Sequence, residues 1–303
     1  MGYLPKKGVG TELVEFKSAG HDVQGCLFSP DPKLFDTPST AVVMVHGVES
    51  HWYAPPTMFL GSYLAEAGYA ALGYNGVHSG ESFRTSEFPA AVEEVGAAID
   101  FIKSCGFEKI LLLGHSLGTP IVEYYQGDSP DAAVKALAVY GPHIDIPGVT
   151  RDSLLGPELY EQFAGECRKL VAAGKGEEIK LLPFREGRVI ITSAKTFLSY
   201  RDVESSKASV EKMIRNITVP LLIVYDEGDN IQGKGSVTRR ATIAQRIKDN
   251  AVGSPKAEIL VIPSKPGNSP FQAHLFNQNE RLVTEKTVKW LNTVGLPTAP
   301  RKN

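Results

Sequence analysis

The sequence has few cysteines. Its three cysteines, Cys26, Cys105 and Cys167, are widely spaced in a chain of 303 residues. An odd, scattered set fits neither a disulfide framework nor a cysteine-rich metal site, and it favours a reducing compartment. The sequence also has no apolar run near the roughly 18 residues that a membrane span needs, and its first ten residues show no apolar core of a signal peptide. We therefore expect a cytoplasmic protein that does not cross a membrane.

An excess of charge of one sign is missing as well. The 32 basic residues nearly balance the 34 acidic residues, which argues against a nucleic-acid groove or a basic membrane-binding patch. Glycine-rich phosphate loops and clusters with metal-ligand spacing are absent from the sequence. We expect no cofactor, no metal and no nucleic-acid partner. The sequence leaves the oligomeric state open, a homodimer included.

What the sequence does contain is an alternation of strands and helices. Two segments at the front, 11–18 and 22–28, flank a glycine-containing turn and predict a hairpin. Short apolar runs predict buried strands at 41–45, 69–74, 109–113, 134–140, 219–225 and 257–262. Apolar residues at helical spacing predict helices at 57–67, 90–104, from 120, 238–248 and 279–294. This order predicts an α/β protein with a mostly parallel sheet and helices on both of its faces.

The alternation stops between residues 141 and 216. This stretch is charged, helices are expected at 158–173 and 203–214, and no run is typical of a buried strand. About 75 residues are too many for a loop. We expect a core domain of residues 1–140 and 217–303, and an inserted cap of residues 141–216. The cap would lie over the carboxyl ends of the strands, where open α/β sheets bind ligands.

One motif points to chemistry. Gly114-His115-Ser116-Leu117-Gly118 follows an apolar strand and precedes a helix. This Gly-x-Ser-x-Gly pattern is typical of a sharp turn that lifts a serine hydroxyl above a sheet, with glycines where strand and helix approach each other. The motif alone also arises by chance about once in ten chains of this length, so the residues around it decide its meaning.

A serine nucleophile needs a histidine base and an acid that orients the histidine. On this scaffold the acid follows the serine and the histidine comes last. Of seven histidines only His143 and His274 follow Ser116, and only His274 also follows the acids after the 219–225 strand. Asp229, beside Gly228, is the favoured acid. Asp226 is the alternative, although it could instead tie down the loop backbone.

The negative oxygen of a tetrahedral intermediate needs backbone N–H donors. Leu117, directly after the serine, is expected to supply one of them. The loop after the 41–45 strand reads His46-Gly47-Val48-Glu49-Ser50, and the N–H of Val48 is expected to supply the other.

With these residues the chain resembles an α/β-hydrolase-fold serine hydrolase of the esterase and lipase-like superfamily. The resemblance rests on 42–47, the Ser116 motif, the 224–229 segment and His274. It implies an eight-stranded sheet, a Ser116–His274–Asp229 triad and no cofactor. The loop 75–82 is similar to the arginine-glycine-x-glycine-x-serine turn of the family but lacks the arginine. Residues 141–216 match no subfamily.

Several residues are candidates for substrate contacts. Glu49, His51 and Trp52 follow the oxyanion turn, and His143 follows the 134–140 strand, so all four are expected near the entrance of the site. Aromatic residues of the cap are expected to form an apolar roof: Phe163, Phe184, Phe197 and Tyr200.

The sequence therefore predicts a hydrolase that cleaves a carboxylic ester, lactone or thioester of a medium-sized organic acid through an acyl-enzyme. An amide-cleaving, aminopeptidase-like hydrolase is the first alternative, with Glu49 as a candidate partner for a substrate amino group. A non-catalytic ligand-binding protein on the same scaffold is the second, and a lyase using the same triad is a third.

Overall fold

The computed structural model describes residues 8–183, 189–231 and 239–302. An eight-stranded sheet with the order β1-β2-β4-β3-β5-β6-β9-β10 forms its centre. The antiparallel hairpin β1–β2 lies at one edge and pairs antiparallel with β4, while all other neighbours are parallel. The strands are β1 Val9–Ser18, β2 His21–Pro30, β3 Thr40–Val45, β4 Ala70–Tyr74, β5 Lys109–His115, β6 Val134–Tyr140, β9 Leu221–Asp226 and β10 Ala257–Ile262. The predicted α/β class and mostly parallel eight-stranded sheet are confirmed.

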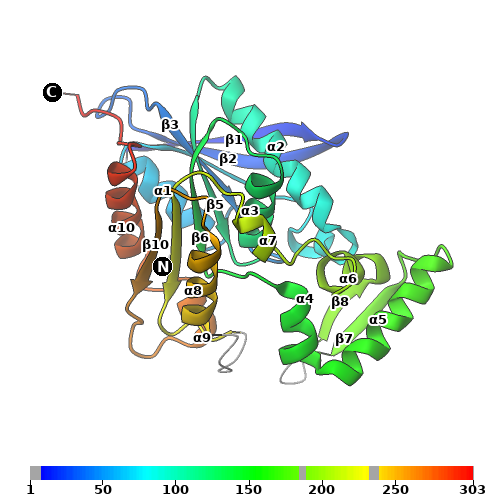
Figure 1. Cartoon of the computed structure of the whole chain (residues 1–303). Helices are drawn as coiled ribbons and strands as arrows, with labels where there is room; N and C mark the ends of the chain where they lie inside the picture. The colour runs from blue at the N-terminus through cyan, green and yellow to red at the C-terminus, as the bar shows by residue number, and fades with distance from the viewer. Residues whose placement is uncertain (1–7, 184–188, 232–238, 303) are drawn as a thin grey trace.

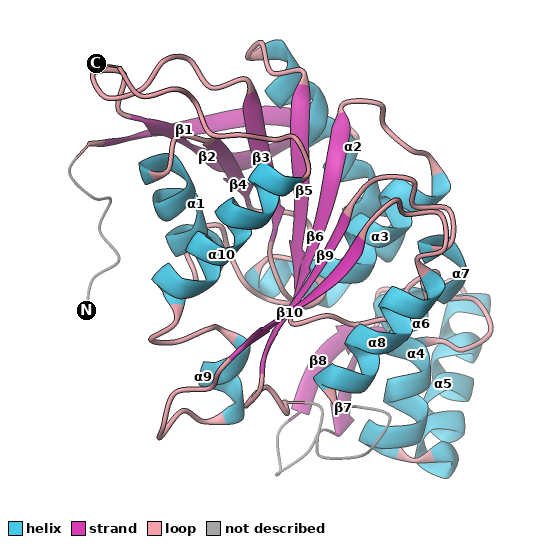
Figure 2. Cartoon of the chain, turned by 60° about the vertical axis from the view of Figure 1, so that its left-hand side comes forward, coloured by secondary structure: helices cyan, strands magenta, loops and turns pink. Residues whose placement is uncertain are grey.

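Helices cover both faces of this sheet (Figures 1 and 2). The helices α1 Thr57–Glu66 and α10 Glu280–Thr293 pack on one face, and α2 Phe88–Ser104, α3 Gly118–Asp128 and α8 Arg240–Asn250 pack on the other. Successive side chains of a strand point to opposite faces. In β3, Val43 therefore belongs to the core under α2 and α3, whereas Val42 and Met44 belong to the core under α1 and α10. Burial on both faces explains the uninterrupted apolar runs.

Most of the segment between β6 and β9 lies beside the sheet, at the lower right in Figure 1, and only its last helix lies next to α3. It contains α4 Ile146–Val149, the helical turn η2 Thr150–Leu155, α5 Pro157–Ala172, the strands β7 Ile179–Pro183 and β8 Val189–Ser193, α6 Ala194–Arg201 and α7 Glu211–Ile214. Part of it has its own apolar core between α5, α6 and β7, which includes Tyr160, Phe163, Cys167 and Phe197. The division into core and cap domains stays a prediction.

Two local expectations in this segment are wrong. The antiparallel pair β7–β8 was not expected, because most of its residues are only half-buried or exposed and give no buried-strand pattern. The expected helix 203–214 is reduced to α7. Asp202 explains the difference: its backbone O accepts the N–H of Ser206 at 2.9 Å and its Oδ2 accepts the Ser205 hydroxyl at 2.6 Å. Such local bonds of Asp and Ser compete with a helix.

No helix within residues 8–183, 189–231 and 239–302 is long and apolar enough to cross a membrane.

Candidate active site

Ser116 lies at the sharp turn between β5 and α3. Its φ is +54°, in the left-handed region that non-glycine residues rarely occupy. The flanking glycines are required by packing. A Cβ on Gly114 would overlap the backbone of Gly118 and lie 2.8 Å from the Val122 side chain, and a Cβ on Gly118 would overlap the carbonyl of Val45. The motif therefore marks a turn in which strand and helix touch through backbone.

Backbone and side-chain hydrogen bonds hold this turn in place. The N–H of Ser116 donates to the carbonyl O of Tyr140 at the end of β6, at 2.9 Å. The Thr119 hydroxyl donates to the Ser116 carbonyl O at 2.7 Å and accepts the N–H of His143 at 2.9 Å. The ends of β5 and β6 are thus joined next to the serine.

The predicted base and acid are brought together. His274 is the last residue of α9, Pro270–His274, whose first turn is fixed by a capping box between Ser269 and Gln272. Nδ1 of His274 lies 2.7 Å from Oδ2 of Asp229, and both side chains are buried. His274 Nε2 is buried without a hydrogen-bond partner among the described residues.

His274 lies beside the serine turn. Its backbone O is 3.1 Å from Nε2 of His115, and the centroids of the two rings are 4.6 Å apart. The hydrogen bonds of the described residues do not include one between Ser116 Oγ and His274 Nε2. Such a contact is often longer than a hydrogen bond before substrate binds.

Asp226 and Asp229 have different surroundings. Asp226 is fully buried at the end of β9, where Oδ1 accepts the N–H of Gly228 at 2.9 Å and Oδ2 accepts the amide of Asn279 at 3.1 Å. It ties the loop backbone and the start of α10 together. Asp229, three residues beyond the end of the strand, is the carboxylate that contacts His274.

Arg240, the first residue of α8, contacts the same acid. Its Nε donates to Oδ2 of Asp229 at 2.8 Å and its Nη1 donates to the carbonyl O of Pro142 at 2.5 Å. Its Nη2 lies 3.5 Å from Nε2 of His143. The guanidinium is only 2 % exposed. Sequence reasoning missed Arg240 because an arginine at a helix start belongs to no motif, and only the packing of α8 brings it to Asp229.

The electrostatics of this cluster favour an ionised acid. Burial by itself raises the pKa of Asp229, but the charge of Arg240 and the contact with His274 outweigh burial and hold that pKa well below its usual range. Burial, together with the charge of Arg240, holds the pKa of His143 well below its ordinary value. The His143 ring is therefore neutral at pH 7.

The predicted oxyanion loop lies against the serine turn. A Cβ on Gly47 would lie 3.0 Å from Cβ and 3.5 Å from Oγ of Ser116. Glu49 has a φ of +52°, and its N–H donates to the carbonyl O of His78 at 3.0 Å. None of the hydrogen bonds within the described ranges uses the N–H of Val48 or Leu117, so both groups can donate to a ligand oxygen.

The loop that lacks the family arginine is anchored by other residues. Buried Glu94 of α2 accepts the N–H of Val77 on Oε2 at 2.8 Å and contacts Nε2 of His21 through Oε1 at 2.9 Å. Nε2 of His46 lies 2.8 Å from the Ser79 hydroxyl. Because the carbonyl of His78 holds Glu49, this anchoring also fixes the oxyanion loop.

The four candidate substrate-contact residues lie in two places. His143 lies next to the Asp229 cluster. His51 stacks on Tyr53 with ring centroids 4.6 Å apart, and Trp52 packs edge-on against Phe28 of β2, so both are partly used in packing. Glu49 is exposed beside Val48.

The expectation that aromatic residues of the cap form an apolar roof over the site is largely wrong. Phe163 and Phe197 are buried in the core of the inserted segment, and Tyr200 packs on Phe83 and Phe88. Phe184 lies outside the described residues.

Comparisons with known proteins give one family-model match and a set of similar structures. The model of the serine aminopeptidase S33 family matches residues 36–175. A search of curated proteins finds no match. Among solved structures, Est1E from Butyrivibrio proteoclasticus with ferulic acid bound is 19% identical, covers 92% of this chain and 98% of its own, and has a TM-score of 0.67. The siderophore hydrolase EstB from Aspergillus fumigatus is 15% identical over 96% and 99%, with a TM-score of 0.68. A thermostable carboxyl esterase from Bacillus coagulans is 13% identical over 94% and 98%, with a TM-score of 0.66.

Proposed function

The chain has the α/β-hydrolase fold, and on that premise we propose that it is a serine hydrolase that cleaves a carboxylic ester, lactone or thioester of a medium-sized organic acid. One observation carries the proposal: the buried His274–Asp229 pair lies beside a serine in the left-handed conformation at a strand-to-helix turn. A structural role does not require this combination of strain and buried charge.

The proposed reaction begins with proton transfer. Nε2 of His274 takes the hydroxyl proton of Ser116 while Oγ attacks the substrate carbonyl carbon. The N–H groups of Val48 and Leu117 stabilise the negative oxygen of the tetrahedral intermediate. His274 then returns the proton to the leaving alcohol or thiol. Water, activated by His274, attacks the acyl-enzyme and releases the acid.

Asp229 has two effects in this scheme. It accepts the Nδ1–H of His274, which leaves Nε2 unprotonated and able to accept the serine proton. It also stabilises the imidazolium that forms after the transfer. The low pKa of Asp229 supports this role, because the carboxylate stays ionised although its side chain is buried.

We also propose that residues 141–216 act as a cap over this site in a cytoplasmic enzyme. The segment leaves the sheet at Tyr140, whose carbonyl holds the backbone of Ser116. The substrate would then enter between the cap and the oxyanion loop.

An amide-cleaving reaction is the second candidate, since the matching family model carries an aminopeptidase name. The esterase and hydrolase names of the structural neighbours favour esters. The test compares a 4-nitrophenyl ester with an amino-acid 4-nitroanilide at equal enzyme concentration. A higher kcat/KM for the anilide would assign the amide reaction instead.

The alternative that the chain is a non-catalytic ligand-binding protein is tested separately. A fluorophosphonate probe labels an activated serine covalently. We expect labelling of the wild-type protein and none of Ser116→Ala. A wild-type protein that resists the probe and cleaves no ester would contradict the proposal.

A further inference from the structure

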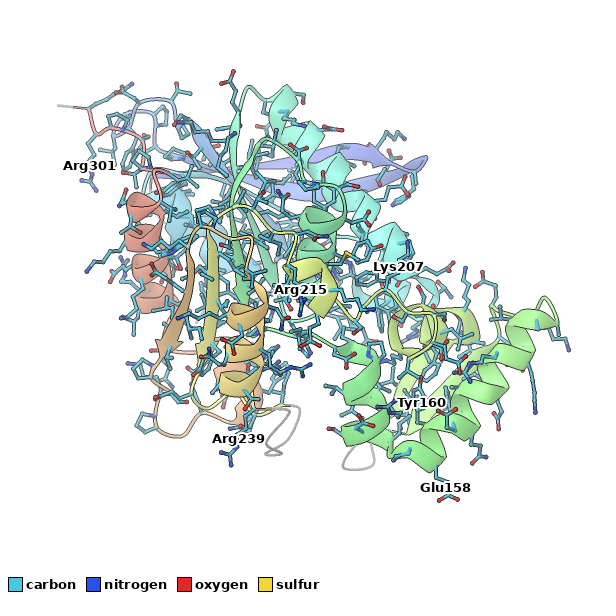
Figure 3. All side chains as sticks on the ribbon, in the orientation of Figure 1. Glu158, Tyr160, Lys207, Arg215, Arg239 and Arg301 are labelled. Atoms are coloured by element: carbon cyan, nitrogen blue, oxygen red, sulfur yellow. The ribbon has the colours of Figure 1, made fainter. Side chains whose placement is uncertain are left out.

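Arg201 is an arginine of the inserted segment with an unusual environment. It is the last residue of α6, and it is only partly exposed. Nη1 donates to the hydroxyl of Thr150 at 2.9 Å. Tyr160, labelled in Figure 3, donates its hydroxyl to the backbone O of Arg201 at 3.0 Å. The first contact holds the guanidinium, and the second holds the backbone of Arg201.

The charge of this guanidinium has no ion-pair partner among the described residues. The neighbouring Asp202 forms an ion pair with Arg168 instead, between its Oδ1 and Nη2 of that arginine. Burial lowers the pKa of Arg201 to about 10, and the charge of Glu49 only partly opposes this. A partly buried cation without an ion-pair partner is costly, so a negatively charged group of a ligand that reaches it would be stabilised.

The free edge of the guanidinium has the right shape for such a partner. With Nη1 engaged by Thr150, the Nε and Nη2 atoms of Arg201 remain without a hydrogen bond within the described residues. Neither atom belongs to the polar atoms that are sealed off from solvent. Two parallel N–H donors on one edge match the two oxygens of a carboxylate.

Arg201 also belongs to the surroundings of the candidate site. Glu49, the residue whose charge acts on it, directly follows Val48 in the oxyanion loop. The preceding Gly47 contacts the serine turn. The helix α6 packs against α4, which follows β6, and against η1, Gly80–Thr85, which follows the loop that anchors Glu49. The end of α6 therefore lies among elements that adjoin the serine turn and the oxyanion loop.

From this arrangement we propose that Arg201 binds a carboxylate of the substrate through its Nε–Nη2 edge, so that the enzyme prefers esters that carry a second, negatively charged group. The inference rests on the proposed hydrolase function and narrows its substrate class. Glu49, whose negative charge acts on Arg201, repels the same carboxylate and weakens its binding.

The first test uses two pairs of esters that differ only in a free or methylated carboxylate. In one pair, 4-nitrophenyl hydrogen adipate and its methyl ester, the carboxylate is on the acyl side. In the other, 4-(butyryloxy)benzoate and its methyl ester, it is on the alcohol side. The readout is the ratio of kcat/KM for the free acid to kcat/KM for the methyl ester, because this ratio cancels any loss of folded enzyme.

We expect the wild-type ratio to exceed one for at least one pair, and Arg201→Gln to lower it about 10- to 100-fold, the range for a hydrogen-bonded charge. Arg201→Lys keeps the charge but not the planar edge, so it should lower the ratio less. Glu49→Gln should raise the ratio. The control is Arg215→Gln, which changes the net charge equally. Arg215, labelled in Figure 3, follows α7, and the hydrogen bonds of its guanidinium within the described residues go to Asn250.

A second test separates this inference from the hydrolase function. Calorimetry measures binding of adipate to the wild-type protein and to Arg201→Gln, and needs no catalysis. Weaker binding by the variant supports the inference even if no ester is cleaved, in which case only the hydrolase function fails. Ratios that are equal in wild type and Arg201→Gln for both pairs, or adipate binding that does not depend on Arg201, would overturn it.

Discussion

Arg240 and His274 share one oxygen of Asp229: Nε of the arginine lies 2.8 Å and Nδ1 of the histidine 2.7 Å from Oδ2. The arginine therefore acts on the histidine through the carboxylate. It keeps Asp229 ionised and holds its orientation, but it also draws electron density from the acid that must stabilise an imidazolium. The balance between the two effects can be measured.

The pH profile of kcat/KM tests Arg240. The guanidinium lowers the pKa of Asp229, so Arg240→Gln should raise that pKa. Loss of this positive charge also favours the imidazolium form of His274, which cannot act as the base, so the acidic limb of the profile should move to higher pH. Arg240→Lys, which keeps the charge, should shift it less. Urea unfolding should show a loss of about 3–5 kcal/mol for Arg240→Gln, the usual cost of breaking a buried pair. A loss of stability with an unmoved acidic limb would mean that Arg240 is only structural.

The two aspartates can be separated by matched substitutions. Asp229→Asn should lower kcat about 10⁴-fold at pH 7 with little loss of stability, because the amide favours the wrong tautomer of His274. Asp226→Asn should instead cost about 1–3 kcal/mol of stability, because Oδ1 and Oδ2 hold the loop backbone and Asn279. Steady-state kinetics and urea unfolding of both variants decide the assignment. The reverse pattern would identify Asp226 as the triad acid.

Two substitutions of Ser116 separate chemistry from strain. Ser116→Ala and Ser116→Gly both remove the hydroxyl, and each should lower ester hydrolysis by about 10⁴-fold or more. The φ of +54° costs a side chain about 1 kcal/mol but costs glycine little. Ser116→Gly should therefore be more stable than Ser116→Ala by about 1 kcal/mol in thermal and urea unfolding. Equal stabilities would show that the left-handed conformation is not strained.

The glycines of the serine turn should not tolerate substitution, because a side chain would collide with the backbone. A Cβ on Gly114 meets the backbone of Gly118, which cannot move without separating β5 from α3, so Gly114→Ala should cost about 3 kcal/mol or prevent folding. The matched control is Gly165→Ala in α5, where a Cβ meets nothing within 4 Å. That change should stabilise the helix by about 0.5–1 kcal/mol. Soluble yield and melting temperature report both.

Glu123 predicts a pH dependence of stability that is independent of catalysis. This α3 residue is fully buried and both carboxyl oxygens lack a partner within the described residues. Burial raises its pKa well above the ordinary value of 4.5. The contribution of the neutral Glu123 carboxyl to the free energy of unfolding is therefore fully present below pH 4.5. It is lost as the pH rises, because the carboxyl ionises freely only in the unfolded chain.

Glu123→Gln removes this titration. Its stability relative to wild type should increase by about 1.4 kcal/mol per pH unit above pH 4.5, until the pH passes the folded-state pKa. Urea unfolding at pH 5, 6, 7 and 8 measures the slope. Glu158→Gln, at an exposed position of α5 (Figure 3), should show no such trend. Parallel curves for Glu123→Gln and wild type would contradict a neutral buried carboxyl.

The sequence by itself determined the order of elements. Strands buried on both faces must be apolar at every position, as in Val42-Val43-Met44-Val45, so the inner strands of the sheet are visible without coordinates. The Gly-x-Ser-x-Gly turn is visible for a similar reason, because its spacing follows from one local collision between strand and helix. The candidate triad could be named since few histidines follow Ser116.

The tertiary structure decided what depends on contacts between distant segments. Arg240 reaches Asp229, Glu94 replaces the missing loop arginine and Arg201 is partly buried near Glu49 only because helices far apart in sequence pack on the sheet ends. Neither motif nor periodicity marks such residues, since their role comes from burial and charge, which depend on the folded surroundings. The hairpin β7–β8 was not predicted because its residues are not uniformly buried. A strand can be recognised in a sequence mainly when its burial requires a regular pattern of apolar residues.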